Sequence, residues 1–408
     1  MNLLNRRSFL LATSAAATAG SVSGGPPAPP AAQSACAAVT LSGRRLTRPL
    51  AITMWDFSWL ERRWPGAGYE DWDQALDELK ERGYDAVRID AYPHLVATDP
   101  EREWDLLPCW NQHDWGSPAH CRVRVQPALN EFIAKCGQRG ILVGLSTWFR
   151  EDTPQNLCTR IASPDQLGQI WKATLDSISP PLRRHILYVD LCNEFPQHIS
   201  TPFLPNGFQR DSPEGQRWMR DSIAPLRRAY PQLSYTFSFA TEYDTWRQQD
   251  VAFLDFLEPH VWMTSFCDFY QQIGYRWEMF DPVGYETIVA KAEKLYRSKP
   301  PYWHSRLEYG VSLMAEWSRV SGKPLITTEC WAVVVYKDWP LLNWGWVKEL
   351  CELGVRRASA AGRWAAMATS NFCGPQFRGM WRDVGWHQRM TDVIHSAALP
   401  LVRERPPT

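Results

Sequence analysis

Two glutamates, Glu194 and Glu329, end apolar segments of similar form in widely separated parts of the chain. Residues 186–194 have the sequence ILYVDLCNE, and residues 324–329 have the sequence PLITTE. An apolar run rich in strand-favouring residues predicts a buried strand, which places its polar end at the edge of a sheet. In α/β barrels the carboxyl ends of the strands carry the chemistry. The two glutamates are therefore candidates for a catalytic pair, with a salt bridge or a helix-cap contact as the alternative for each.

A pair of carboxyl groups suits the hydrolysis of a glycosidic bond. One carboxylic acid protonates the leaving oxygen, and the other carboxylate attacks the sugar or activates water. Glu242 also ends an apolar segment, but only Glu194 is preceded by an asparagine, which favours Glu194 as the partner of Glu329. The other polar and aromatic residues at predicted strand ends are candidates to bind the substrate. They are Trp55, Arg88, Trp148, Asn193, Tyr243, His260, Trp262, Trp331 and Asn371.

Several of these candidates have a second interpretation. Arg88 either lies beside a catalytic carboxylate or pairs with Asp56 or Asp90 inside a barrel core. His260 is expected to position other groups rather than to act as a general base. The chain has 22 tryptophans, whose rings stack on the C–H faces of sugars but also pack in cores. Their places at strand ends favour sugar binding for the candidate tryptophans.

Strand-like and helical segments alternate along the chain from residue 49 onward. Strands are predicted at 50–59, 84–92, 141–149, 186–194, 233–241, 259–265, 324–330 and 364–372. Helices are predicted at 69–82, 126–139, 164–178, 214–230, 246–257, 285–297, 306–321, 342–361 and 387–397, with insertions at 94–124, 195–212 and 266–282. Eight alternations predict an α/β fold, a (β/α)8 TIM barrel with insertions after several strands. A doubly wound sheet is disfavoured, because no glycine-rich phosphate motif follows the first strand.

The N-terminal region has the features of an export signal. Arg6 and Arg7 are followed by Ser8-Phe9-Leu10 and an alanine-rich apolar run too short to span a membrane comfortably. A linker rich in proline, glycine and alanine comes next. We therefore expect a twin-arginine-type signal and linker in residues 1–35, a catalytic barrel in residues 49–408, and export to the periplasm or the medium.

Composition narrows the range of partners. The net charge is +0, which gives no reason to expect nucleic acid or an anionic membrane surface as a partner. No Cys-x-x-Cys or His-x-x-x-His spacing indicates a metal site, so no metal and no cofactor are expected. The carboxylate pair and the tryptophans predict a carbohydrate as the partner. Cys109 and Cys121 share one insertion and are candidates for a disulfide after export. The sugar, endo or exo action and the oligomeric state stay open.

The motifs at the strand ends resemble those of clan A glycoside hydrolases, and most closely the cellulase-like family 5 group, from residue 49 to the end of the chain. The motifs are Arg88 after the second strand, Asn193-Glu194 after the fourth, His260 on the sixth and Glu329 after the seventh. The resemblance implies a retaining enzyme in which Glu194 is the acid/base and Glu329 is the nucleophile. It also implies that Asn193 holds the sugar 2-hydroxyl and that Arg88 keeps Glu329 ionised.

The chain also departs from the family pattern. The usual Asn-Glu-Pro is extended by Phe195, and the usual His-x-Tyr ends in Trp262, so the missing hydroxyl must come from another residue, such as Tyr243 or Tyr270. Asn371 stands at the end of the eighth strand, where many relatives have a tryptophan. An inactive carbohydrate-binding barrel is therefore the alternative to an enzyme. A metal-dependent barrel hydrolase is disfavoured by the lack of paired histidines.

Overall fold

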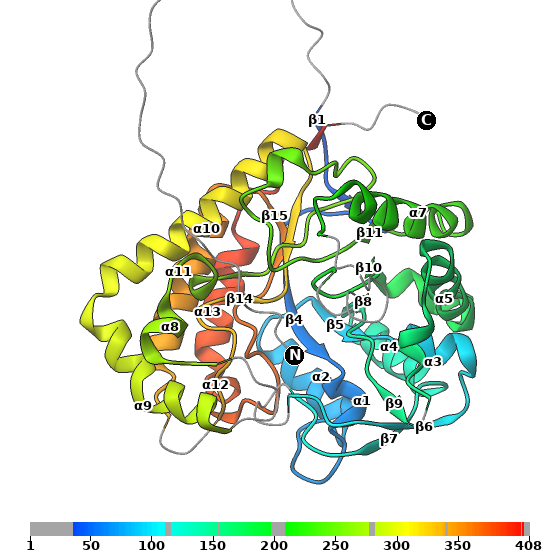
Figure 1. Ribbon diagram of the computed structural model, residues 1–408, viewed down its shortest axis with the longest axis horizontal. Coiled ribbons are helices and arrows are strands. Elements are labelled where there is room, and N and C mark those ends of the chain that lie inside the picture. Colours follow the sequence, from blue (N-terminus) through cyan, green and yellow to red (C-terminus); the bar gives the residue numbers. More distant parts are fainter. Residues whose placement is uncertain are drawn as a thin grey trace, which may run out of the picture. The chain divides into compact units, whose positions relative to one another are not determined.

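The computed structural model describes residues 36–110, 116–153, 155–196, 209–276, 282–338, 342–400 and 402–403. The expected export signal, residues 1–35, lies outside this part of the chain. Seven parallel strands form one curled sheet in the order β11, β10, β8, β5, β4, β15, β13, and helices surround it on the outside (Figure 1). These strands are β4 (Leu50–Asp56), β5 (Ala86–Asp90), β8 (Leu142–Ser146), β10 (Ile186–Asp190), β11 (Tyr235–Thr236), β13 (Leu325–Thr327) and β15 (Trp364–Met367).

Residues 257–262 close this sheet into a barrel as its sixth strand. Phe239, just after β11, forms a parallel bridge with Pro259, and Leu257 forms another with Leu325 of β13. Farther along, β12 (Val261–Trp262) pairs in parallel with β14 (Cys330–Trp331). Since β11 and β13 are the two edges of the seven-stranded sheet, in which β15 pairs with β4, these contacts complete a ring of eight parallel strands. The predicted (β/α)8 TIM barrel is confirmed.

The interior of the barrel is divided into an apolar floor and a polar layer above it. Ile52, Phe256 and Ile326 belong to a fully buried cluster near the amino ends of the strands. A hairpin of β2 (Thr40–Leu41) and β3 (Arg44–Arg45) adds Leu41 to the same cluster and covers this end. Because side chains alternate along a strand, the next inward positions are two residues farther on, and they are mostly polar.

Helix α2 (Trp72–Glu81) illustrates how local sequence sets the outer ring. The Asp71 carboxylate accepts hydrogen bonds from the first-turn amides, and the helix ends before Gly83, whose φ of +87° suits glycine.

The other helices are α1 (Ser58–Glu61), α3 (Pro93–Thr98), α4 (Ala128–Gln138), α5 (Pro164–Ser177), α7 (Pro213–Ala229), α8 (Phe269–Ile273), α9 (Pro282–Ser298), α10 (Pro300–Ser321), α11 (Gly345–Ala361), α12 (Arg378–Trp381) and α13 (Val384–His395). Short 3-10 turns are η1 (Leu157–Arg160), η2 (Pro180–His185), η3 (Trp246–Gln248) and η4 (Met263–Phe266), and β1 (Cys36–Ala37) pairs with β16 (Val402–Arg403).

The predicted helix at 246–257 is wrong beyond its first turn, η3. The amide of Asp255 donates to the carbonyl of Tyr235, and the amide of Leu257 donates to the carbonyl of Pro324. These amides bind carbonyls of the two neighbouring strands, so they cannot also donate within a helix. The insertion at 94–124 holds α3 and most of a small antiparallel sheet of β6 (Glu103–Leu106), β7 (Cys121–Arg124) and β9 (Asp152–Thr153).

The structure does not contain the disulfide expected between Cys109 and Cys121; both side chains are free thiols. The Cys121 thiol instead lies 3.6 Å from Oε2 of Glu61, a buried carboxylate held by Arg150. Burial raises the pKa of the Cys109 thiol to about 11. Within the described residues no helix has both the length and the apolar character to cross a membrane.

Candidate active site

Glu194, His260 and Glu329 meet at the carboxyl ends of the strands. One ligand atom from each residue lies within 4.8 Å of the other two, and all three side chains are buried. Nδ1 of His260 lies 2.9 Å from Oε1 of Glu194 and 3.6 Å from Oε1 of Glu329. The fourth, sixth and seventh strands of the barrel thus bring together two carboxyl groups and the imidazole between them.

The contacts of His260 indicate which of its nitrogens carries a proton. Nη1 of Arg88 lies 3.2 Å from Nε2 of His260, and a guanidinium can only donate. Nε2 must therefore accept, which leaves Nδ1–H to donate to Glu194. Burial lowers the pKa of His260, but the charges of Glu329 and Glu194 outweigh burial, and the net shift is upward.

Arg88 connects the carboxylate of Glu329 to the polar layer inside the barrel. Its Nε and Nη2 atoms donate to the two carboxylate oxygens of Asp56, each over 2.8 Å. Nη2 also donates to Oε1 of Glu329 over 2.5 Å. Both interpretations of Arg88 therefore hold, since it pairs with Asp56 in the core and also with Glu329. Burial raises the pKa of Glu329, and the electrostatic influence of His260 and Arg88 opposes that rise.

Two residues of this cluster were not among the sequence candidates. Nη1 of Arg88 donates to Thr328 over 2.7 Å and lies 3.4 Å from Oε1 of Glu258. Glu258 stands two positions before His260, so period-two alternation places both on the inner face of the barrel. That alternation was the signal that could have found it. Thr328 adjoins Glu329 and carries no separate sequence signal.

The carboxylate and imidazole groups of this cluster could in principle hold a metal ion. Glu194, His260 and Glu329 have the donor types and the spacing of a metal-ion site. However, Arg88 donates to the Glu329 oxygen that lies closest to the imidazole. A cation in this position would face the guanidinium at short range, so the site fits a cation poorly.

Asn193 offers an unused amide beside the carboxylates. It is fully buried, and neither its Nδ2 nor its Oδ1 has a hydrogen-bond partner in the structure. Two more predicted residues, Trp262 and Asn371, likewise each have a buried polar atom without a partner, Nε1 and Oδ1 respectively. Buried polar groups are nearly always paired, so these atoms are candidates to bind a ligand.

Trp55 and Trp331 are not sugar platforms, contrary to expectation. The indole of Trp55 donates to the carbonyl of Cys373 over 3.1 Å and packs on Phe132 of α4. The indole of Trp331 donates to the carbonyl of Ala368 over 2.9 Å, and its ring lies against α11. Both rings are almost completely buried and face the helices. Trp55 does so because it stands one position before Asp56, whose side chain points into the barrel toward Arg88.

The other aromatic candidates have mixed positions. Trp148 is half-buried beside the cluster, and its indole donates to Oδ2 of Asp56. The hydroxyl of Tyr243 donates to the backbone carbonyl of His260, and that of Tyr270 accepts from the amides of Val334 and Val335. The hydrogen-bond donor that the structure shows on Glu329 is Arg88. Glu242 does not belong to the cluster and contacts the hydroxyl of Thr241.

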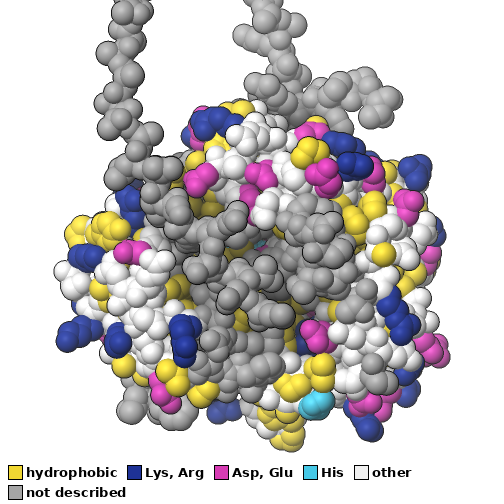
Figure 2. All heavy atoms as spheres, in the orientation of Figure 1, with side chains coloured by type: hydrophobic (Ala, Val, Ile, Leu, Met, Phe, Trp, Pro, Cys, Tyr) yellow, Lys and Arg dark blue, Asp and Glu magenta, His cyan; other side chains and the backbone are white. Residues whose placement is uncertain are grey.

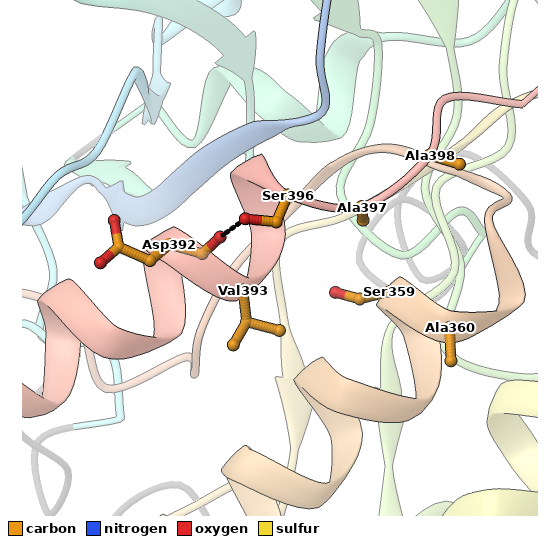
Figure 3. Close-up of a pocket in the computed structure, with 7 residues that line it drawn as sticks. All are labelled: Ser359, Ala360, Asp392, Val393, Ser396, Ala397 and Ala398. Atoms are coloured by element: carbon orange, nitrogen blue, oxygen red, sulfur yellow. Dashed lines mark hydrogen bonds between the residues drawn. The ribbon is translucent and has the colours of Figure 1, made fainter.

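The described residues form a surface with charges of both signs and a depression outside the site. Lys and Arg side chains are mixed with Asp and Glu over the face in Figure 2, in keeping with the zero net charge. A depression of about 490 Å³ lies between α11 and α13 and includes Ser359, Asp392 and Val393 (Figure 3). It is near the amino ends of the strands, since α11 leads directly into β15, and so it is remote from the carboxylate pair.

Comparisons with known proteins agree with the geometry. The family model described as sugar-binding cellulase-like matches residues 52–395. A candidate glycoside hydrolase from Parabacteroides distasonis has a solved structure that is 50% identical, with a TM-score of 0.84 over 86% of this chain and 95% of that one. No curated protein gives a significant match.

More distant solved structures share 12% identity. A family 5 xyloglucan-specific β-1,4-glucanase from a ruminal metagenomic library has a TM-score of 0.49 over 87% of this chain and 97% of that one. A family 5 protein from Streptomyces cattleya, in complex with GlcNAc, has a TM-score of 0.48 over 86% and 82%. At this distance they carry no argument about the substrate. From the match of the family model and the half-identical relative, we conclude that this chain belongs to the sugar-binding, cellulase-like family of glycoside hydrolase barrels.

Proposed function

We propose that the protein is an exported, retaining glycoside hydrolase that cleaves a β-glycosidic bond in an oligo- or polysaccharide. The observation that supports this most strongly is the approach of Glu194 and Glu329, whose ligand atoms lie within 4.8 Å of each other. Carboxyl groups about 5–5.5 Å apart are typical of retaining enzymes, whereas inverting enzymes leave room for water at about 6.5–9.5 Å. The short separation therefore favours a covalent glycosyl-enzyme route.

In this proposal the two glutamates have different roles. Glu329 attacks the anomeric carbon while Glu194 gives its proton to the glycosidic oxygen, and the leaving sugar departs. Glu194, now ionised, then takes a proton from the water that hydrolyses the ester to Glu329. Arg88 stabilises the Glu329 carboxylate before attack and after release. His260 orients Glu194 through its Nδ1–H, and Asn193 binds the hydroxyl next to the anomeric carbon.

Azide rescue of two alanine variants tests these roles. Glu329→Ala removes the nucleophile, so turnover is lost, and azide that fills the space gives a glycosyl azide of inverted configuration. Glu194→Ala removes the acid, so aryl glycosides with good leaving groups still react and the intermediate accumulates. Azide then gives a product of retained configuration. Glu242→Ala is the matched control, because this glutamate also follows a strand but lies outside the cluster, and its activity should match the wild type.

The alternative is an inactive carbohydrate-binding barrel, which the departures at Trp262 and Asn371 keep open. It predicts that the wild type binds oligosaccharides without turnover in a screen of aryl glycosides and cell-wall polysaccharides. Inverted product from the wild type, or unchanged rates in both alanine variants, would contradict the assignment of the two glutamates.

A further inference from the structure

Glu258 lies directly beneath the candidate site, on the inner wall of the barrel. Its side chain is completely buried. Oε1 accepts a hydrogen bond from the hydroxyl of Thr328 over 2.6 Å and lies 3.4 Å from Nη1 of Arg88. Oε2 has no hydrogen-bond partner among the described residues. One oxygen of this carboxyl is therefore engaged and the other is unused.

The guanidinium of Arg88 is shared among three carboxyl groups. It binds Asp56 through two hydrogen bonds of 2.8 Å and Glu329 through one of 2.5 Å, whereas its contact with Glu258 is the longest at 3.4 Å. A buried carboxylate without a close cation is costly, and such a group takes up a proton instead. By this geometry Glu258 is the carboxyl of the three that is held neutral, with Oε2 as the atom free to carry the proton.

The groups that face Glu258 from the surrounding strands act on its pKa in both directions, and burial together with Asp190 outweighs the groups that lower it. These groups are Arg88 from β5, Asp190 and Tyr188 from β10, His260 from its own strand, and Thr328 from the seventh strand. Burial raises the pKa of Glu258 to about 7, the charge of Asp190 adds to the rise, and Arg88 opposes it. The hydroxyl of Tyr188 also has no hydrogen-bond partner in the structure.

We propose that Glu258 is a positioning residue of this site, which leaves Arg88 to Glu329 when it is neutral and competes with Glu329 for the same guanidinium when it is ionised. The inference rests on the proposed function, in which Glu329 is the nucleophile. On ionisation the O–H bond at Oε2 breaks and the proton passes to water; no bond between heavy atoms changes, and the effect passes through Arg88 and Thr328. Activity therefore falls as Glu258 ionises, because the nucleophile loses part of its cationic partner.

The replacement Glu258→Gln tests this, because the amide imitates the neutral acid and never ionises. At about pH 5, where wild-type Glu258 is neutral, kcat should stay within about threefold of the wild type, which is half a pKa unit of interaction. Above about pH 7.5 the variant should become more active than the wild type, and its alkaline limb should move to higher pH. Glu258→Leu, which holds neither Thr328 nor Arg88, should lose kcat at least about tenfold with little change in KM.

Glu61→Gln is the matched control. Glu61 is another completely buried glutamate paired with an arginine, Arg150, over 2.8 Å, and its other partners are Tyr92 and Cys121. This variant should keep the wild-type pH profile. The proposal is overturned if Glu258→Gln has the wild-type pH profile, or if Glu258→Gln and Glu258→Leu lose activity equally.

A measurement without turnover separates this inference from the proposed function. Infrared difference spectra of wild type and Glu258→Gln should show the carbonyl band of a protonated carboxyl at low pH, with a titration midpoint of about 7. If the band is absent, the neutral state of Glu258 is wrong whatever the activity. If the band titrates as expected but the wild type hydrolyses no glycoside, the proposed function fails while the protonation of Glu258 stands.

Discussion

Arg88 donates from Nη2 to Oε1 of Glu329 over 2.5 Å, and the arginine side chain is completely buried while the glutamate is 5% exposed. A guanidinium at this distance favours the ionised form of a carboxyl group. Burial acts in the opposite direction and raises the pKa of Glu329. The protonation state of the proposed nucleophile is therefore a balance between burial and its cationic neighbours.

Removing that charge should move the acid limb of the pH profile. In Arg88→Met the pKa of Glu329 rises further, so kcat/KM should begin its increase about one pH unit or more above the wild type. Arg88→Lys keeps the positive charge but loses the planar guanidinium that donates to two carboxyl groups. This variant should therefore lose kcat, with a smaller shift of the acid limb of the pH profile. The measurement is kcat/KM against pH, with thermal unfolding to monitor folding. An unshifted acid limb in a folded Arg88→Met would contradict the link between the two residues.

Asn193→Ala should separate activity from stability. Its amide makes no hydrogen bond in the structure, so the free energy of unfolding should change by less than about 1 kcal/mol. A hydrogen bond to the sugar 2-hydroxyl strengthens in the transition state, so kcat/KM should fall about 100-fold or more. A 2-deoxy glycoside supplies the check, since wild type should discriminate against it and the variant should not. Equal discrimination by both proteins would remove Asn193 from this role.

Asp85 gives a prediction about acid unfolding. Its carboxylate binds Arg48, the amide of Ala51 and Nε2 of His395, which joins α13 to the barrel. Burial raises the pKa of Asp85, but these partners, led by His395, outweigh burial and the net shift is downward. Its contribution is therefore present above the unfolded pKa of about 3.9 and is lost as pH falls through the lower folded value.

Asp85→Asn should accordingly lose roughly 1.5–3 kcal/mol of unfolding free energy at neutral pH. The difference from the wild type should shrink as pH falls below about 4. Urea unfolding at several pH values measures both effects. Asp77→Asn is the control, because Asp77 also pairs with an arginine but its side chain is 66% exposed, and this variant should unfold like the wild type. A difference for Asp85→Asn that is independent of pH would refute the linkage.

Export is testable through the arginine pair near the N-terminus. The twin-arginine interpretation rests on Arg6 and Arg7 followed by Phe9 and Leu10. Replacing both arginines with lysine should leave full-length precursor in the cytoplasm, and fractionation followed by immunoblotting measures it. Normal export of the double variant would mean that another signal directs the chain.

Strand ends could be predicted from the sequence because apolar runs stop there on polar residues. That reasoning reached Glu194, His260 and Glu329, which the fold does bring together. It does not separate inward from outward positions, so it predicts a sugar platform at Trp55, which lies one residue before Asp56 and faces a helix. Period-two alternation, applied strand by strand, would have excluded it and would have included Glu258.

Other features depend on tertiary context that a single sequence does not contain. Residues 246–257 have a helical composition, but after η3 the backbone forms turns, and Asp255 and Leu257 donate hydrogen bonds to the neighbouring strands. The sharing of Arg88 among Asp56, Glu258 and Glu329 requires side chains from four strands. Such a convergence is set by barrel closure, for which the sequence gives strand number but not register.

The apolar floor of the barrel separates the acidic layer above it from solvent at the amino ends of the strands. This floor is made of Ile52, Phe256, Ile326 and the hairpin residue Leu41. In the proposed mechanism, both proton transfers of Glu194 therefore take place on the side of the strand carboxyl ends. The proton that Glu194 gives up leaves with the departing sugar, and the proton that it regains comes from the attacking water.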